Sequence, residues 1–347
     1  MEIGGAFAIQ ETNPPQTDTI FHRLSAYETV YTDSGRSAAR LLSAVLPQGP
    51  VLLPAYICAS VCSCFPDRPL RFFRLTETLQ FDWDDLFRQL DGSAVLYLHY
   101  FNGALPEEAR LRQLREEAQR RGIVIVEDST HSIFSAPLTI GDYGVCSLRK
   151  WFPIPDGGVL YGNRLPAIPQ PVQEDAPRCH EIQQAMEWKA RYLRGGEPES
   201  CNLAYRAAFI AGEHALDSQQ LCFRLSPFSR AVLEGCSVSA IAAARRENYA
   251  TLWHLLSTLP NLRPVGIPGE RDCPFFFPVR LKNGEKVRTN LQSEKVYCPI
   301  HWPMEGVLAE NWESVQYSRE ELSLPIDQRY GKADMQRLAS ALCKTME

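Results

Sequence analysis

The first half of the chain alternates between short apolar runs and amphipathic segments. Apolar residues recur at helical spacing from Gly35 to Val45, and Pro47 and Gly49 end the predicted helix. Further helices are predicted over residues 82–90 and 106–121. Short apolar runs predict buried strands at residues 51–53, 70–75, 94–100, 123–126 and 159–161. This alternation predicts an α/β fold with a three-layer α/β/α large domain, in which helices cover both faces of a mostly parallel sheet.

The second half of the chain has longer helical patterns. A proline-rich stretch from Leu165 to Pro177 predicts a surface crossing without regular structure. After it, the pattern predicts helices at 181–194, 204–216, 237–259 and 332–343, and short strands at 275–281 and 295–299. We therefore expect a large domain over residues 1–235, which includes an N-terminal arm, and a small α+β domain over residues 236–347.

Composition and charge narrow the class of protein. With 45% hydrophobic and 22% charged side chains over 347 residues, the chain is typical of an ordinary globular protein. Its 41 acidic and 36 basic residues give a net charge of -5, so we expect no nucleic-acid partner. No apolar run approaches the ~20 residues that span a bilayer, and the amino terminus lacks the pattern of a signal peptide. We therefore expect a cytoplasmic protein without a membrane segment.

The cysteines do not suggest a disulfide framework or a metal site. There are eleven, an odd number, and no two have the Cys-x-x-Cys spacing. The densest group is Cys58, Cys62 and Cys64, which has no further His or Cys nearby in the sequence. Because free cysteine is among the most buried residue types, we expect buried thiols and no metal ion.

Lys150 stands out because the chain uses arginine almost everywhere else. Only seven of its 36 basic residues are lysines, and Lys150 is the first of them. A lysine amine can form a Schiff base, whereas a guanidinium stays protonated. Lys150 also lies between a predicted strand and Gly157-Gly158, in the kind of loop that holds active sites in open α/β sheets. The alternative is a solvated lysine on a surface loop.

Asp128 directly follows the predicted strand 123–126. A carboxylate at the carboxyl end of a buried strand can meet a cationic nitrogen of a ligand. If that ligand is pyridoxal phosphate, Asp128 would pair with the pyridine nitrogen and keep it protonated. The alternative is that Asp128 is only a turn residue that ends a strand.

The segment Ser34-Gly35-Arg36-Ser37 lies at the start of the first predicted helix. The backbone N–H groups and the positive end of the helix dipole at such a position can hold a phosphate, and Gly35 permits a close approach. Alternatively, Ser34 or Ser37 serves only as a helix N-cap.

Several short motifs occur in a fixed order along the chain. They are Ser34-Gly35, Leu53-Pro54-Ala55-Tyr56, Leu98-His99-Tyr100 with Gly103, Glu127-Asp128-Ser129-Thr130-His131, Ser147 with Lys150, Gly157-Gly158, Ile300-His301-Trp302 and Leu322-Ser323-Leu324-Pro325. This ordered set resembles the DegT-type sugar aminotransferases, which are fold type I pyridoxal-phosphate enzymes. The resemblance extends from about Tyr31 to Ala341.

The resemblance implies a role for each matching residue. It makes Lys150 the lysine of the internal aldimine and later the base that moves a proton between substrate and cofactor. It assigns Asp128 to the pyridine nitrogen and places His131 beside the cofactor ring, although His131 is equally compatible with a core position. The remaining assignments are Gly35, Arg36 and Ser147 to the cofactor phosphate and His301 to the substrate.

The chain also departs from the family pattern. Ser147 precedes Lys150 by only three residues, and Cys58 stands where the family has an aromatic residue that stacks on the cofactor, so that Tyr56 or Tyr100 would have to substitute. The family's Asn-Tyr-Arg segment, which reaches the cofactor phosphate of the neighbouring subunit, corresponds here to 222–224, where Cys222 replaces the Asn.

The resulting expectation is a homodimeric pyridoxal-phosphate aminotransferase. It would move an amino group from an amino acid donor to a keto sugar, such as a nucleotide-linked one, or to another carbonyl acceptor. Three alternatives stay open at this point: another pyridoxal-phosphate reaction at the same carbon, a non-catalytic or regulatory protein of the same fold, and a nucleotide-binding protein without this cofactor. The last would leave Lys150 unexplained.

Overall fold

The structure is a computed structural model that describes residues 2–195, 198–304, 306–309 and 312–346. The chain forms two compact units. The first unit comprises residues 6–45 and 145–238, and the second comprises residues 2–5, 46–144 and 239–347. These units divide the chain differently from the expected domains 1–235 and 236–347, which also include residues outside the described ranges. The boundary near residue 235 therefore stays a prediction.

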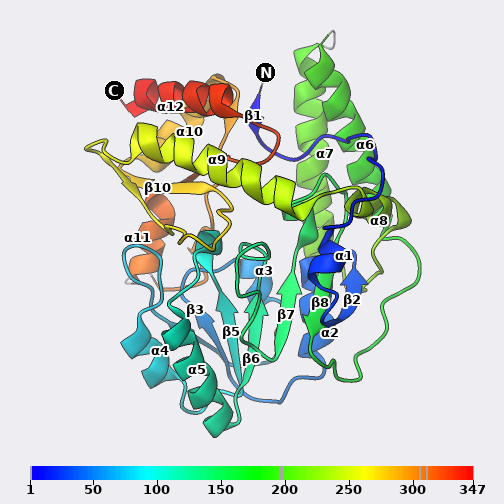
Figure 1. Ribbon diagram of the computed structural model, residues 1–347, viewed down its shortest axis with the longest axis vertical. Helices are drawn as coiled ribbons and strands as arrows, with labels where there is room; N and C mark the ends of the chain where they lie inside the picture. The colour runs from blue at the N-terminus through cyan, green and yellow to red at the C-terminus, as the bar shows by residue number, and fades with distance from the viewer. Residues whose placement is uncertain (1, 196–197, 305, 310–311, 347) are drawn as a thin grey trace. The chain divides into compact units, whose positions relative to one another are not determined.

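The first unit begins its regular structure with a strand that leads directly into a helix. Strand β2 (Glu28–Thr32) pairs antiparallel with β8 (Gly158–Gly162), and α2 (Gly35–Ser43) follows β2 and packs on β8 (Figure 1). α2 buries Ala38, Leu41 and Leu42, the apolar stripe that its sequence spacing predicts. The short helices α1 (Ile20–Arg23) and α8 (Pro227–Glu234) belong to the same unit and pack on each other.

Two long helices complete the first unit. α6 (Pro177–Arg194) and α7 (Glu199–Ser218) lie side by side as a hairpin (Figure 1). α6 begins four residues before the predicted start at residue 181. Pro177 occupies its first turn, where a backbone N–H has no partner within the helix and its absence costs nothing.

The second unit contains the parallel strands. β3 (Val51–Pro54) pairs in parallel with β4 (Leu70–Phe73) and β5 (Val95–His99), and β5 pairs in parallel with β6 (Val124–Asp128), so that their order is β6-β5-β3-β4. Helix α4 (Trp83–Gln89) packs on β4 and α5 (Glu108–Arg121) packs on β6. The prediction of an α/β fold with mostly parallel strands is confirmed.

Strand β6 is longer than its apolar run. The expected strand ended at Val126, but Glu127 pairs in register with Leu98 and Asp128 pairs with His99. Asp128 is thus the last residue of the strand and not the first residue of a turn. The polar residues stay in the strand because tyrosine hydroxyls and backbone N–H groups of other segments satisfy their carboxylates.

The remaining elements of the second unit form a smaller α+β arrangement. An antiparallel sheet has the order β12-β10-β9, with β9 at Leu262–Pro264, β10 at Phe277–Leu281 and β12 at Glu321–Leu324. Strand β1 (Ile3–Gly4) pairs in parallel with β11 (Val296–Tyr297). The helices are α3 (Ala59–Cys62), α9 (Val238–Leu256), α10 (Gly284–Ser293), α11 (Glu313–Glu320) and α12 (Lys332–Met346). The described residues include no helix with the length and apolar character that a membrane span requires.

Candidate active site

Lys150 closes a short 3-10 helix, η2 (Leu148–Lys150), which follows β7 (Tyr143–Cys146). The backbone of this turn is fixed because the N–H of Leu148 donates to the Gly157 carbonyl at 3.0 Å. The next residue, Trp151, is fully buried, whereas Lys150 is exposed. Lys150 is therefore an exposed residue on a turn that a backbone hydrogen bond holds in place.

The mouth of helix α2 lies beside this turn. Ser34 caps the helix because its Oγ accepts a hydrogen bond from the Ser37 N–H at 3.1 Å. The Ser37 hydroxyl donates to Asp33 Oδ1 at 2.6 Å. Both hydroxyls thus serve the helix itself, and the N-cap interpretation of Ser34 is confirmed.

Glycines allow β8, α2 and the lysine turn to meet. A Cβ atom on Gly158 would lie 2.2 Å from the Ser34 carbonyl carbon and oxygen and 2.5 Å from the Gly35 nitrogen. A Cβ atom on Gly35 would lie 3.0 Å from Ser147 Cβ. Gly158 and Gly35 therefore bring β8, the start of α2 and Ser147 into close contact, and a side chain on Gly158 would push the strand away from the helix.

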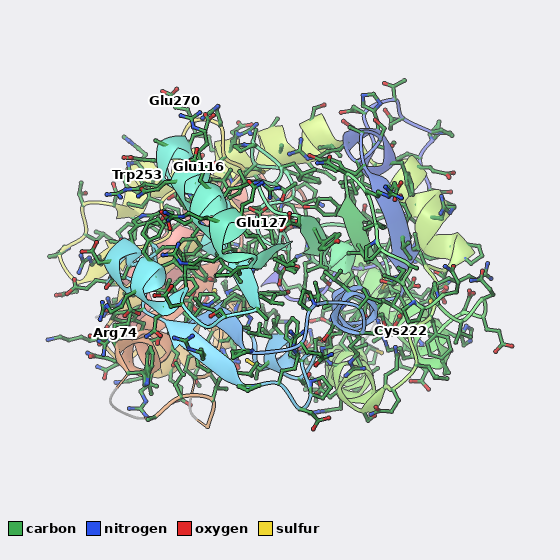
Figure 2. All side chains as sticks on the ribbon, turned by 90° about the horizontal axis from the view of Figure 1, so that it is seen from below. Arg74, Glu116, Glu127, Cys222, Trp253 and Glu270 are labelled. Atoms are coloured by element: carbon green, nitrogen blue, oxygen red, sulfur yellow. The ribbon has the colours of Figure 1, made fainter. Side chains whose placement is uncertain are left out.

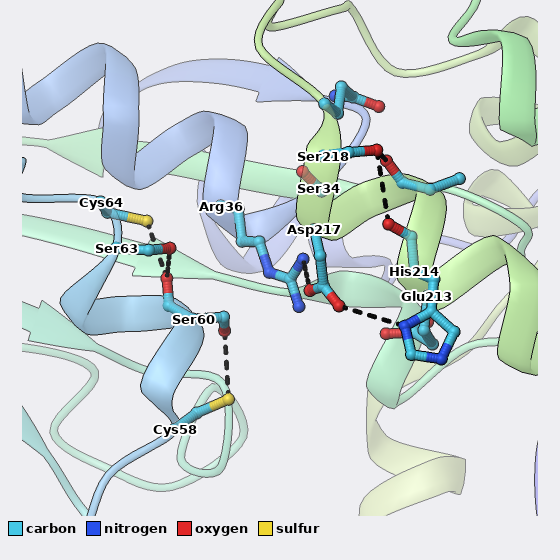
Figure 3. Close-up of polar contacts among 12 residues, drawn as sticks. Ser34, Arg36, Cys58, Ser60, Ser63, Cys64, Glu213, His214, Asp217 and Ser218 are labelled. Atoms are coloured by element: carbon cyan, nitrogen blue, oxygen red, sulfur yellow. Dashed lines mark hydrogen bonds and ion pairs between the residues drawn. The ribbon is translucent and has the colours of Figure 1, made fainter. Parts of the chain in front are cut away.

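The arginines of this region are paired with acidic residues of the α6–α7 segment. Arg36 Nη1 lies 2.5 Å from Asp217 Oδ1 (Figure 3), and Arg149 donates to both carboxylate oxygens of Glu213, with Nη2 to Oε2 at 2.9 Å. Burial raises the pKa of Glu213, but the charges of Arg149, Lys150 and Arg178 outweigh it and hold that pKa well below its usual range. Sequence reasoning missed Glu213 and Asp217, because they lie in a segment that matches no motif.

The segment from Cys222 to Arg224 is fixed within the first unit. The Val172 N–H donates to the Cys222 carbonyl at 2.8 Å, and the Arg224 N–H donates to the Val172 carbonyl at 3.0 Å. Arg224 forms an ion pair with Asp175 at 3.3 Å. Burial raises the pKa of the Cys222 thiol (labelled in Figure 2).

In the second unit, Asp128 ends β6 and is 8% exposed. Its Oδ2 accepts from the Tyr97 hydroxyl at 3.1 Å, and its Oδ1 accepts from the Thr130 N–H at 2.9 Å. His99 Nδ1 lies 3.6 Å from the same Oδ2. Burial raises the pKa of Asp128, but His99 and Thr130 together lower that pKa by more than burial raises it. The net shift is downward, and the carboxylate stays ionised.

His99 and His131 lie within an aromatic cluster of the second unit. Their ring centroids are 4.5 Å apart. The His131 ring stacks on Phe275 at 4.3 Å and on Trp302 at 5.3 Å, and its Nδ1 accepts from the Asn102 N–H at 3.2 Å. These contacts favour the interpretation of His131 as a core residue, while the neighbouring His99 has two buried ring nitrogens without a hydrogen bond.

His301 joins the same cluster and leads to a carboxylate that the sequence did not reveal. Its ring centroid is 5.2 Å from that of His131, and its Nδ1 lies 3.0 Å from Ser323 Oγ. Its backbone N–H donates to Glu321 at 2.7 Å, and the Tyr56 hydroxyl donates to the same fully buried carboxylate at 3.3 Å. The only sequence sign of Glu321 is a charged residue before the apolar run at 322–325.

Tyr56 and Tyr100 are the suggested substitutes for the stacking aromatic residue. The hydroxyl of each donates a hydrogen bond to a buried glutamate. Tyr56 is buried against Trp302 at 5.4 Å between ring centroids, and Tyr100 donates to Glu127. Cys58 is the residue before α3 and makes no capping hydrogen bond with its side chain; its Sγ lies 3.1 Å from Ser60 Oγ (Figure 3). All eleven cysteines are unbonded to each other, and the described residues contain no group of His, Cys, Asp and Glu that could hold a metal ion.

Comparison with known proteins adds the fold family. Neither a protein-family model nor a curated protein matches the sequence. Solved structures do match: a DegT DnrJ EryC1 StrS aminotransferase from Brucella abortus shares 14% identity and a TM-score of 0.63, over 94% of this chain and 87% of that chain. This chain therefore has the same fold as that aminotransferase.

Two further structures have the same fold. PseC of Helicobacter pylori, an aminotransferase involved in the biosynthesis of pseudoaminic acid, shares 12% identity and a TM-score of 0.67, over 94% of this chain and 88% of that chain. The PLP form of a putative sugar aminotransferase from Streptococcus pneumoniae shares 15% identity and a TM-score of 0.64, over 99% and 94%. The resemblance to DegT-type enzymes that the motifs indicate is confirmed at the level of the fold.

Proposed function

We propose that this protein is a pyridoxal-phosphate-dependent aminotransferase that moves an amino group from an amino acid to the carbonyl of a keto sugar. The observation that carries the proposal is the position of Lys150, an exposed residue on the turn η2, next to Ser147, which lies against Gly35 at the start of α2. The DegT-type fold supports the same class of reaction, although the fold alone does not establish it.

The residues of the first unit fit the phosphate of this cofactor. Gly35 lies at the positive end of α2, where the first backbone N–H groups have no partner within the helix and no Cβ hinders a close approach. The Ser147 side chain lies next to Gly35. Gly35, Arg36 and Ser147 would hold the phosphate there.

The residues of the second unit fit the ring of the cofactor. Asp128 is buried and ionised, and the Tyr97 hydroxyl and the Thr130 N–H fix its two oxygens. Such a carboxylate favours a protonated ring nitrogen over a neutral one. His131 would lie beside the ring, and Phe275 and Trp302 hold its imidazole in place.

The chemistry then divides between cofactor and protein. When bound, pyridoxal phosphate supplies an electron sink for the negative charge that develops on the substrate carbon. Lys150 would hold the cofactor through its amine and would accept and return the proton of the substrate carbon. Glu321 and Ser323 orient His301, which we assign to substrate binding. Glutamate is the donor to test first, and we expect a homodimer.

The first experiment follows the covalent attachment of the cofactor to Lys150. The purified full chain is mixed with pyridoxal phosphate, its visible absorbance is recorded, and borohydride then fixes any adduct for peptide mass spectrometry. We expect a modified Lys150, no adduct in Lys150→Ala, and an unchanged adduct in Lys282→Ala, which removes an exposed lysine elsewhere. Glutamate should bleach the absorbance band and release the 2-oxo acid.

Other outcomes select between the alternatives. An adduct at Lys150 that no amino donor changes would point to another reaction at the same carbon. Absence of an adduct in the wild type would refute the proposal and favour a non-catalytic protein of this fold, for which the pairing of Arg36, Arg149 and Arg224 with carboxylates is the supporting observation.

A further inference from the structure

Two carboxylates of helix α7 hold the arginines beside the α2 mouth. Glu213 and Asp217, which we call the α7 carboxylate pair, are four residues apart and therefore lie on the same face of the helix. Glu213 binds the Arg149 guanidinium with both oxygens, and Asp217 binds Arg36 (Figure 3). One helix face thus engages a cation of the α2 mouth and a cation of the lysine turn.

The position of Asp217 in α7 is unfavourable for a negative charge. Asp217 lies in the last turn of α7, which has no basic residue, and a negative charge there opposes the negative end of the helix dipole. Glu213 is also stabilised as an anion by the charge of Lys150. Asp217 also lies 3.7 Å from His214 Nδ1 of the same helix (Figure 3). The arginine partners of the pair, however, come from the lysine turn and the α2 mouth.

The arginine and carboxylate sides of the pairs differ in exposure. The Arg36 and Arg149 side chains are 16% and 15% exposed, whereas Glu213 and Asp217 are 42% and 56% exposed. The carboxylates therefore have more contact with water than the guanidinium groups that they pair with. Because Glu213 takes both Nη donors of Arg149, a phosphate that uses the same donors has to displace it.

We propose that the α7 carboxylate pair competes with a phosphate group for Arg149 and Arg36 and so weakens anion binding at the mouth of α2. The identity of that phosphate as the cofactor's rests on the proposed function, but the competition applies equally to inorganic phosphate. Loading with cofactor would then require the pair to release both arginines, which makes the α7 face an internal inhibitor of the site.

The test compares a charge-free pair with a matched control. The variant Glu213→Gln/Asp217→Asn removes two negative charges from the α7 face and preserves side-chain size. The control Glu181→Gln/Glu187→Gln removes two from exposed positions of α6 in the same unit. Calorimetry measures the Kd for inorganic phosphate, and absorbance measures the Kd for pyridoxal phosphate and for pyridoxal, which lacks the phosphate.

We expect phosphate and pyridoxal phosphate to bind about fivefold more tightly to the variant, the effect of an ion pair at the strong end of the range for surface pairs. Pyridoxal, which lacks the phosphate, should gain less affinity than pyridoxal phosphate, because only the change of charge near Lys150 affects it, and the control should match the wild type. Phosphate affinity that is unchanged or weaker in the variant would overturn the inference, as would a wild type and variant that both fail to bind phosphate. If the double variant does not fold, Asp217→Asn alone provides the same comparison at the more exposed position.

The outcomes also separate this inference from the proposed function. Tighter phosphate binding without any Lys150 adduct would support the competition and refute the aminotransferase. A Lys150 adduct with equal phosphate affinity in variant and control would support the aminotransferase and refute the competition.

Discussion

Gly158 leaves no room for a side chain between β8 and the backbone at the start of α2. In Gly158→Ala, the new Cβ would lie 2.2 Å from the carbonyl carbon and oxygen of Ser34, against 3.4 Å or more for ordinary contact. The obstructing atoms are backbone atoms at the start of α2, so no side-chain rotation relieves the clash. Strand β8 and α2 must move apart, although β8 is held by its pairing with β2 and α2 packs on β8.

We expect Gly158→Ala to lower the free energy of unfolding by about 3 kcal/mol, the upper end of the usual cost of overpacking. Urea denaturation followed by circular dichroism measures this loss as a lower midpoint. The control is Gly331→Ala, in which the new Cβ meets no atom within 4 Å. We expect its midpoint to stay close to that of the wild type.

The same substitution tests the α2 mouth as an anion site. Because the added methyl group displaces the Gly35 nitrogen, which lies 2.5 Å from its position, phosphate affinity should fall as well. A Gly158→Ala protein that unfolds at the same urea concentration as Gly331→Ala and binds phosphate normally would refute the described approach of β8 to α2.

Three further predictions concern single polar groups. Burial raises the pKa of Glu127 (labelled in Figure 2) from 4.5 to about 7. Glu127 therefore contributes fully to the free energy of unfolding below pH 4.5, and this contribution declines as the pH rises to 7. Glu127→Gln should abolish the decline, measured as the free energy of unfolding against pH. Tyr97→Phe removes a hydrogen bond to the ionised Asp128 and should cost about 2 kcal/mol in the free energy of unfolding, measured in urea. Ser34→Ala removes the N-cap of α2 and should cost about 1 kcal/mol in the same assay.

Each of these has a direct control. A stability difference between wild type and Glu127→Gln that stays constant from pH 4.5 to 7 would contradict the raised pKa. Tyr143→Phe, at a half-buried tyrosine of β7, and Ser218→Ala, at the exposed end of α7, should each change the free energy of unfolding by less than about 0.5 kcal/mol. Equal losses in these controls would show that the named hydrogen bonds contribute nothing specific.

The sequence alone determined the local elements and their class. Apolar spacing located α2, α5 and the parallel strands. A helix must bury one apolar face, and a strand of a parallel sheet must bury its whole apolar run, whichever segment covers them. Gly122 ends α5 in the left-handed conformation that glycine favours. The start of α6 at Pro177 was also within reach of a local rule, since proline is common in the first turn of a helix.

The ordered motifs determined the resemblance to DegT-type enzymes, but not the surroundings of each residue. The extension of β6 through Asp128 depends on Tyr97 and on register with β5, and the burial of Glu321 depends on Tyr56, 265 residues away along the chain. Neither partner is visible from spacing.

Only the tertiary structure placed the α7 carboxylate pair on Arg36 and Arg149. In the sequence, Glu213 and Asp217 are two charges on a predicted helix, and the residue that spacing offers as a local partner is His214, not an arginine. Local patterns record how a segment meets water or a core, whereas an ion pair forms between side chains that folding brings within a few ångströms from distant parts of the chain. For this reason the sequence predicted the elements and the candidate lysine, and the fold decided which charges surround them.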